Sequence, residues 1–136
     1  MPTDRRSVTA PGAPAAVGPY RHAIVSAGLL FCSGQTPLDP ETNELVGGSV
    51  GDQARRCLDN LEAVCVAAGT SLSAAVRIGV FMTDLGRFAE LNEVYGAFFE
   101  DAGVEDPPAR VTVGVAALPL GAEVEMDAIV ALPATD

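Results

Sequence analysis

The sequence contains no lysine and no tryptophan, and it contains a single histidine. Without lysine, the chain cannot form a Schiff base, attach pyridoxal phosphate or supply the lysine of a P-loop. One histidine, His22, is too few for a histidine-rich metal site, and we predict neither a metal nor another cofactor. The three cysteines, Cys32, Cys57 and Cys65, lack CxxC spacing, so we expect them to be buried and reduced.

Basic residues are also few. Eight arginines stand against 18 acidic residues, which gives a net charge of −10 at pH 7. Binding to nucleic acid or anionic lipid needs a basic patch, so this balance argues against both. The N-terminus has no apolar signal-peptide region, and no apolar run approaches the roughly 18 residues that span a bilayer. We therefore expect a soluble, cytoplasmic protein.

The length of 136 residues and the apolar content of 49% indicate one globular domain over residues 1–136. Residues 1–18 are rich in Pro, Ala and Gly, and we expect an extended edge there, or a mobile arm over residues 1–12. Two short β-rich runs within residues 20–35 are separated by Gly28, which predicts a hairpin.

Two helices and three further strands are predicted after this hairpin. The first helix is capped by Ser49 or Asp52 and ends before Gly69. The second helix extends over residues 87–102 and ends before Gly103. The three strands are predicted over 75–84, 109–116 and 122–131. The order ββ-α-β-α-ββ is typical of an α+β domain, with two helices on one face of a mixed sheet.

The last two strands are interpreted as a hairpin that turns at residues 118–121. This pairing places Arg110 opposite Asp127 and Thr112 opposite Glu125, with Glu125 diagonal to Arg110 at about 7–8 Å. The alternate face of the first strand carries Val111, Val113 and Val115, and we expect this face to meet the helices. The face of the sheet away from the helices carries fewer polar side chains than a solvent-exposed surface normally has. We therefore expect it to be buried against another subunit.

Arg110 is the first candidate for a functional residue, because a guanidinium in the apolar run PPARVTVGVAALP is costly unless it is paired. It either binds the carboxylate of a substrate in a two-pronged way or forms a structural salt bridge across the strands. Spacing alone leaves both interpretations open. His22 is expected at the surface or in an interface, and Asn92 on the surface or at the cap of a helix.

Several stretches together resemble the RidA/YjgF family. They include APAAVGPY at 13–20, FCSGQTPLDPETNELVGG at 31–48, PPARVTV and the closing EVEMDAIV, and the resemblance extends from about residue 13 to residue 131. It implies a chorismate-mutase-like α+β fold and a homotrimer with sites between subunits. It further implies hydrolysis of 2-imino acids such as 2-iminobutanoate and 2-iminopropanoate to 2-keto acids and ammonia.

The resemblance also implies roles for individual residues. The carboxylate-binding arginine corresponds to Arg110 and the water-positioning glutamate to Glu125. The residues that would line the substrate pocket are Tyr20, Ser33, Gly34 and Thr112. Thr112 stands where a cysteine is common, which leaves the role of a thiol there in doubt. An imine carbon is already electrophilic, so these groups suffice without a metal or a covalent nucleophile.

Two other functions remain open at this stage. The same pocket would serve a non-catalytic regulatory trimer that binds a small carboxylate. Alternatively, the chain is a divergent member that acts on another imine or enamine, which Thr112 keeps in play. Some relatives have been described as ribonucleases, but the charge of −10 disfavours that activity here.

Overall fold

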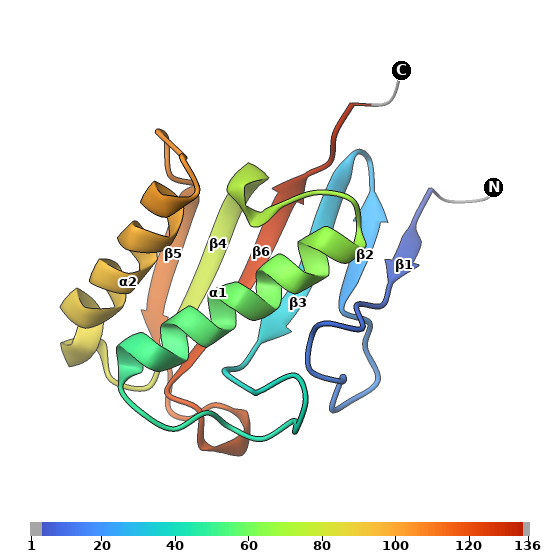
Figure 1. The fold of residues 1–136 in the computed structure, drawn as a ribbon. Helices are drawn as coiled ribbons and strands as arrows, with labels where there is room; N and C mark the ends of the chain where they lie inside the picture. Colours follow the sequence, from blue (N-terminus) through green and yellow to red (C-terminus); the bar gives the residue numbers. More distant parts are fainter. Residues whose placement is uncertain (1–3, 135–136) are drawn as a thin grey trace.

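The fold is a six-stranded mixed sheet with both helices on one of its faces (Figure 1). The structure is a computed structural model that describes residues 4–134. The strands lie in the order β1-β2-β3-β6-β4-β5. The elements are β1 (Arg6–Val8), β2 (Ala23–Ser26), β3 (Leu29–Gln35), α1 (Val50–Ala67), β4 (Ala75–Met82), α2 (Phe88–Asp101), β5 (Ala109–Gly114) and β6 (Val124–Ala131). The α+β prediction, with two helices on one face, is confirmed.

Local signals placed most elements correctly. Strands β2 and β3 form the predicted hairpin, and Ala27 and Gly28 both have positive φ angles (54° and 76°), as a tight hairpin turn requires. Ser49 caps α1 in a capping box with Asp52, and Gly69 follows the helix with a φ of 84°. The hairpin at Gly28, Ser49 as one of two candidate caps, and the left-handed Gly69 were predicted from the sequence, whereas the reciprocal bond to the Asp52 carboxylate and the positive φ of Ala27 were not.

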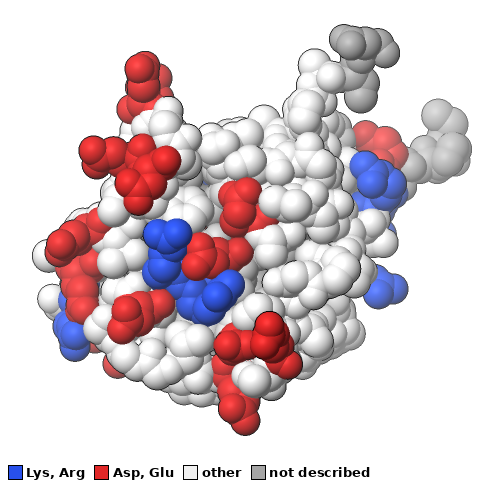
Figure 2. Space-filling view, viewed as in Figure 1, with Lys and Arg blue, Asp and Glu red and all other residues white. Residues whose placement is uncertain are grey.

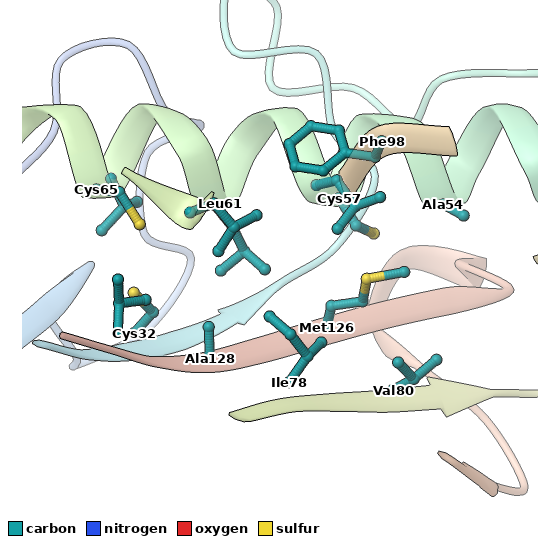
Figure 3. Close-up of a cluster of buried hydrophobic side chains, with 14 of the residues drawn as sticks. Cys32, Ala54, Cys57, Leu61, Cys65, Ile78, Val80, Phe98, Met126 and Ala128 are labelled. Atoms are coloured by element: carbon teal, nitrogen blue, oxygen red, sulfur yellow. The ribbon is translucent and has the colours of Figure 1, made fainter. Parts of the chain in front are cut away.

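The hydrophobic core fills the space between the helices and the sheet (Figure 3). Cys57 and Leu61 of α1 lie over Met126 of β6 and Ile78 of β4, and all four are fully buried. The cysteines are buried and free, as predicted. Burial raises the pKa of the Cys57 thiol well above its usual range, so this group stays protonated and packs like a small apolar side chain.

Of the two expectations for the N-terminal segment, a mobile arm or an extended edge, the structure shows the extended edge. Residues 1–3 lie outside the described range, but Arg6–Val8 form β1, which pairs antiparallel with β2 at the edge of the sheet. His22 is 6% exposed, so its expected surface position was wrong. Its Nδ1 accepts a hydrogen bond from the Ala10 amide (2.9 Å), and its Nε2 donates to the Pro14 carbonyl (2.8 Å). The imidazole ring therefore fastens this segment to the sheet.

The predicted hairpin between the last two strands is wrong. Strand β4 lies between them, parallel to β5 and antiparallel to β6, so Arg110 is aligned with Ile78 and Glu125 with Phe81. Helix α2 connects β4 to β5, and a helical crossover on one face of a sheet produces a parallel pair. The segment 115–123 then carries the chain past the end of β4 to β6 (Figure 1).

The faces of β5 are reversed relative to the prediction. Val111 and Val113 are 39% and 38% exposed, on the sheet face opposite the helices, which we call the open face. Arg110 instead points to α2, where its guanidinium carbon lies 4.7 Å from the centre of the Tyr95 ring. On β6 the prediction holds, because the alternate residues from Val124 to Val130 are buried under the helices. Within residues 4–134, no helix is long and apolar enough to cross a membrane.

Candidate active site

The six predicted site residues separate into two clusters on opposite faces of the sheet. Arg110 and Thr112 lie on the helix-covered side of the edge strand β5. Glu125 alternates with the buried Val124 and Met126 and therefore lies on the open face of β6. Since β4 separates these strands, Arg110 and Glu125 of one chain cannot touch the same small substrate.

The first group, which we call the glutamate cluster, consists of Tyr20, Ser33, Gly34 and Glu125. A Cβ atom on Gly34 would lie 2.5 Å from Oε2 of Glu125, so glycine is what allows the carboxylate to lie against β3. Burial, and secondarily the charge of Asp127, raises the pKa of Glu125 above its ordinary value. A partly buried carboxyl with a raised pKa is suited to accept a proton from water and return it.

Tyr20 and Ser33 line a hollow of about 680 Å³ at the edge of this cluster. The Ser33 hydroxyl donates to the Arg21 carbonyl (2.6 Å), so its proton is already in use and its oxygen is left as an acceptor. Tyr20 is 42% exposed, and its hydroxyl accepts a hydrogen bond from the Val17 amide (3.2 Å). Both side chains are thus positioned by the backbone of the segment before β2.

The second group, the arginine cluster, consists of Arg110, Thr112, Asn92 and Tyr95. The Arg110 guanidinium lies over the ring of Tyr95 at 4.7 Å and near that of Phe88 at 5.5 Å. Cation–π contacts of this kind orient a guanidinium without occupying its N–H donors. In the described range, Arg110 is in none of the salt bridges, so its donors remain available to a carboxylate.

The salt bridge considered from the sequence is therefore absent from residues 4–134. Asp127, the expected partner of Arg110, accepts a hydrogen bond from the Gly79 amide (3.0 Å) and lies 3.9 Å from the Arg77 guanidinium. This arrangement follows directly from the position of β4 between β5 and β6. It removes the structural interpretation of Arg110 that the sequence left open.

Asn92 and Tyr95 were not predicted as site residues. Together with Arg110 they line a hollow of about 450 Å³ at the outer edge of α2 and β5. They are three residues apart on α2 and so share one face of that helix. Their spacing on one helix face was visible in the sequence. The incorrect hairpin, however, placed Arg110 on the sheet face opposite the helices, so Asn92 and Tyr95 were not expected near it.

Two buried hydroxyl groups in the arginine cluster lack a hydrogen-bond partner within the described part of the chain, those of Tyr95 and Thr112. Burial raises the pKa of Tyr95 to about 12, although the nearby charge of Arg110 opposes this, so the phenol is a proton donor at neutral pH. Buried hydroxyls are normally paired. Within residues 4–134, the arginine cluster therefore has two buried hydroxyls without a protein partner.

Neither cluster contains a set of typical metal ligands. Residues 4–134 include no group of three or more His, Cys, Asp and Glu side chains arranged to hold a metal ion. What the two clusters offer is a cation for a carboxylate, a carboxyl with a raised pKa, and several hydroxyl and backbone groups for hydrogen bonding. These groups suit the binding and hydrolysis of a small anionic molecule.

Comparison with known proteins decides the family. The family model described as Endoribonuclease L-PSP matches residues 10–132, nearly the whole chain. The chain belongs to the RidA/YjgF family. Members of this family are known as reactive intermediate deaminases, and the fold described above is their chorismate-mutase-like fold.

Individual relatives cover most of the chain. It is 52% identical to Protein DfrA of Myxococcus xanthus over 127 residues, which is 92% of this chain and 94% of that protein. The crystal structure of E. coli TdcF with bound serine has a TM-score of 0.88 at 39% identity, covering 94% and 99% of the two chains. RidA from the Antarctic bacterium Psychrobacter has a TM-score of 0.87 at 42% identity, covering 93% and 99%.

Proposed function

We propose that this protein hydrolyses 2-imino acids, including 2-iminobutanoate, 2-iminopropanoate and their enamine tautomers, to 2-keto acids and ammonia. Family membership supports a general imine-deaminase type of function. The observation that carries the specific proposal is the Arg110 guanidinium, which is oriented by aromatic rings and has no acidic partner among the described residues. Such a group is suited to bind the carboxylate of an imino acid through two hydrogen bonds.

The active site of this proposal is formed between subunits of a homotrimer. Arg110 and Glu125 lie on opposite faces of one sheet, so a complete site needs the arginine cluster of one copy and the glutamate cluster of another. The open face supports such packing, because Phe31, Val111 and Val113 are between 38% and 42% exposed there. Contacts between two different surfaces of identical chains form a ring when the rotation between neighbours closes, and the trimer implied by the family resemblance is a ring of three copies.

Arg110 anchors the substrate in this site. Its planar guanidinium matches the geometry of a carboxylate, and the rings of Tyr95 and Phe88 hold it in place. The relative TdcF was crystallised with bound serine, whose α-carboxylate has the same relation to the reacting carbon as in a 2-imino acid. We expect Tyr20 to cover the bound substrate from the opposite cluster.

Glu125 controls the water molecule that attacks. The substrate reacts as the protonated imine (iminium). As the water oxygen adds to its carbon, the Glu125 carboxylate takes one water proton and the carbon–nitrogen π electrons become the lone pair of an amine on a tetrahedral carbon. Glu125 then returns that proton to the amine nitrogen, the hydroxyl oxygen forms the C=O bond as the carbon–nitrogen bond breaks, and the departing ammonia takes the hydroxyl proton, which leaves ammonium, the 2-keto acid and the Glu125 carboxylate. No redox change or covalent enzyme intermediate is involved. The raised pKa of Glu125 favours this exchange of protons near neutral pH.

A second candidate function is the binding of a small carboxylate without turnover. It is favoured by Thr112, which replaces the cysteine common at this position in the family motif and whose hydroxyl is buried without a partner in the described range. A third candidate is turnover of a different imine or enamine. Nuclease activity, despite the description of the family model, is not proposed, because acidic side chains outnumber arginines on the face shown in Figure 2 and the net charge is −10.

A coupled assay tests the proposal. A threonine dehydratase generates 2-iminobutanoate, semicarbazide traps the remaining imine, and the trapped product is measured with and without this protein. We expect the protein to lower the amount of trapped imine, to raise free 2-oxobutanoate by the same amount, and to leave the sum of the two unchanged. Binding of 2-oxobutanoate in calorimetry without any loss of trapped imine would favour the regulatory function instead.

A further inference from the structure

Two of the eight arginines of the chain line a single hollow. Arg5 and Arg21 border the hollow of about 680 Å³ that also includes Tyr20 and Ser33 of the glutamate cluster. Neither is in an ion pair, since the salt bridges among residues 4–134 involve Arg55, Arg77 and Arg87. In a protein with a net charge of −10, two unpaired cations at one site produce a local field opposite in sign to that of the whole chain.

The backbone of Arg21 is held firmly in this position. The Ser33 hydroxyl donates to the Arg21 carbonyl (2.6 Å), and the Ser33 amide donates to the carbonyl of His22 (3.0 Å). His22 itself is buried, and both of its ring nitrogens are hydrogen-bonded. The Arg21 side chain therefore extends from a fixed point beside Ser33, adjacent to Gly34 and Glu125.

Arg5 is held by its neighbour in the sequence. The carboxylate of Asp4 accepts hydrogen bonds from the Ser26 hydroxyl (2.8 Å) and the Ala27 amide (2.9 Å), and Arg6 begins β1. These bonds lower the pKa of Asp4 and engage its carboxylate with the β2–β3 turn. The backbone at Arg5 is thus held against the sheet, and the carboxylate of Asp4, its neighbour in the sequence, is engaged with other groups.

We infer that Arg5 and Arg21 select 2-imino acids whose side chain carries a second anionic group, with dicarboxylic 2-imino acids as the preferred substrate class. The inference rests on the proposed function, in which Arg110 of a neighbouring copy holds the α-carboxylate. With the α-carboxylate bound by Arg110, the side chain of the substrate would lie at the hollow lined by Arg5 and Arg21, beside Ser33 and Glu125. A neutral or apolar substrate side chain would form no favourable electrostatic contact with two guanidinium groups there. A carboxylate on the substrate side chain would form charge-assisted hydrogen bonds with them.

Two substrates of matched size test the inference. 2-Iminoglutarate has a carboxylate where 2-iminopentanoate has a methyl group, and an amino-acid oxidase generates either one in place from glutamate or norvaline. We expect kcat/KM to be at least tenfold higher for 2-iminoglutarate. The variants Arg5→Gln and Arg21→Gln together should remove this preference and change kcat/KM for 2-iminopentanoate by less than twofold. Raising the ionic strength should weaken the preference of the wild type.

Arg55→Gln provides the matched control. Arg55 is an exposed residue of α1 that pairs with Asp59, and this variant removes one positive charge far from the hollow. It should leave the preference unchanged. Equal hydrolysis of both imines by the wild type would overturn the inference alone, as would an equal loss of both activities in the double variant with an unaltered mass in light scattering. If neither imine is hydrolysed but 2-iminobutanoate is, the inference alone is overturned. If 2-iminobutanoate is not hydrolysed either, the proposed function itself is overturned.

Discussion

The role assigned to Arg110 changes once its neighbours in the structure are known. Sequence spacing alone favoured a structural salt bridge across the strands over substrate binding, and only the family resemblance reversed that order. In the structure Asp127 instead accepts from the Gly79 amide, and Arg110 lies over the Tyr95 ring. A guanidinium held by aromatic rings keeps its hydrogen-bond donors for a ligand.

The first prediction concerns Arg110→Lys. Lysine keeps the charge but loses the planar, two-pronged donor and its stacking on the rings. Loss of one charge-assisted hydrogen bond of about 1.5–3 kcal/mol corresponds to a fall of roughly 10- to 150-fold in kcat/KM for 2-iminobutanoate. The melting temperature should stay within a few degrees of the wild type, and Arg55→Lys should leave both quantities unchanged. Near-normal activity in Arg110→Lys would remove this residue from the site.

A second prediction concerns Glu125→Gln. The amide has nearly the same shape but cannot accept a proton, so imine hydrolysis should fall about a hundredfold or more while the keto acid product still binds. The variant also tests the raised pKa of Glu125. A carboxyl whose pKa is higher in the folded than in the unfolded protein stabilises the fold in its protonated form, and this contribution is lost as the pH rises through the raised value.

Replacing Glu125 removes that contribution. As the pH rises above about 4, the ordinary pKa of a glutamate, the stability of the wild type should therefore decrease relative to that of Glu125→Gln, as measured by urea midpoints at a series of pH values. Parallel pH profiles would show that the environment of Glu125 does not shift its titration.

The sequence predicted part of the site through its motifs. The SGQ and PAR stretches led to Ser33, Gly34 and Arg110, whereas the reason for glycine at position 34 is visible only in its close approach to Glu125. Asn92 and Tyr95 were missed because the face of a helix that meets a given strand depends on strand order, and strand order is a non-local property.

Among the elements, those defined by local chemistry were predicted well. The capping box at Ser49, the positive φ of Gly69 and the turn at Gly28 each depend on a few adjacent residues. The pairing of β5 with β4, and of β4 with β6, depends on where α2 returns the chain, which no short stretch of sequence determines. For this reason the two strands over 109–131 were wrongly predicted to pair with each other as a hairpin.

The N-terminal segment provides the prediction at this scale. His22→Ala removes a buried ring that accepts from the Ala10 amide and donates to the Pro14 carbonyl. Two buried backbone groups lose their partners, so the free energy of unfolding should fall by about 2–4 kcal/mol in urea titrations. Val17→Ala, a change at a 58% exposed position of the same segment, should have almost no effect. A loss below about 0.5 kcal/mol in His22→Ala would mean that the segment is held by other contacts.

For the whole molecule, the exposed apolar side chains of the open face are the decisive feature. Phe31 is 42% exposed on β3, where it is aligned with Ile24 and Ile129 of the neighbouring strands. Within residues 4–134 no helix covers this face, since both helices lie on the other side (Figure 1). A second copy would bury it.

The corresponding prediction is that light scattering gives about three times the chain mass of 13.9 kDa. Phe31→Glu places a charge in the proposed interface and should yield folded monomers without imine hydrolysis. Val66→Glu, on the exposed side of α1 (62% exposed), should remain trimeric and active. An unaltered mass for Phe31→Glu would exclude the open face from the interface.

The division of the site between opposite faces of the sheet has a genetic consequence. A chain with Arg110→Lys retains an intact glutamate cluster, and one with Glu125→Gln retains an intact arginine cluster. When the two inactive proteins exchange subunits at random in equal amounts, about one site in four receives both wild-type clusters. Two alleles that fail separately should then restore roughly a quarter of the activity when expressed together, whereas two variants within one cluster should restore none.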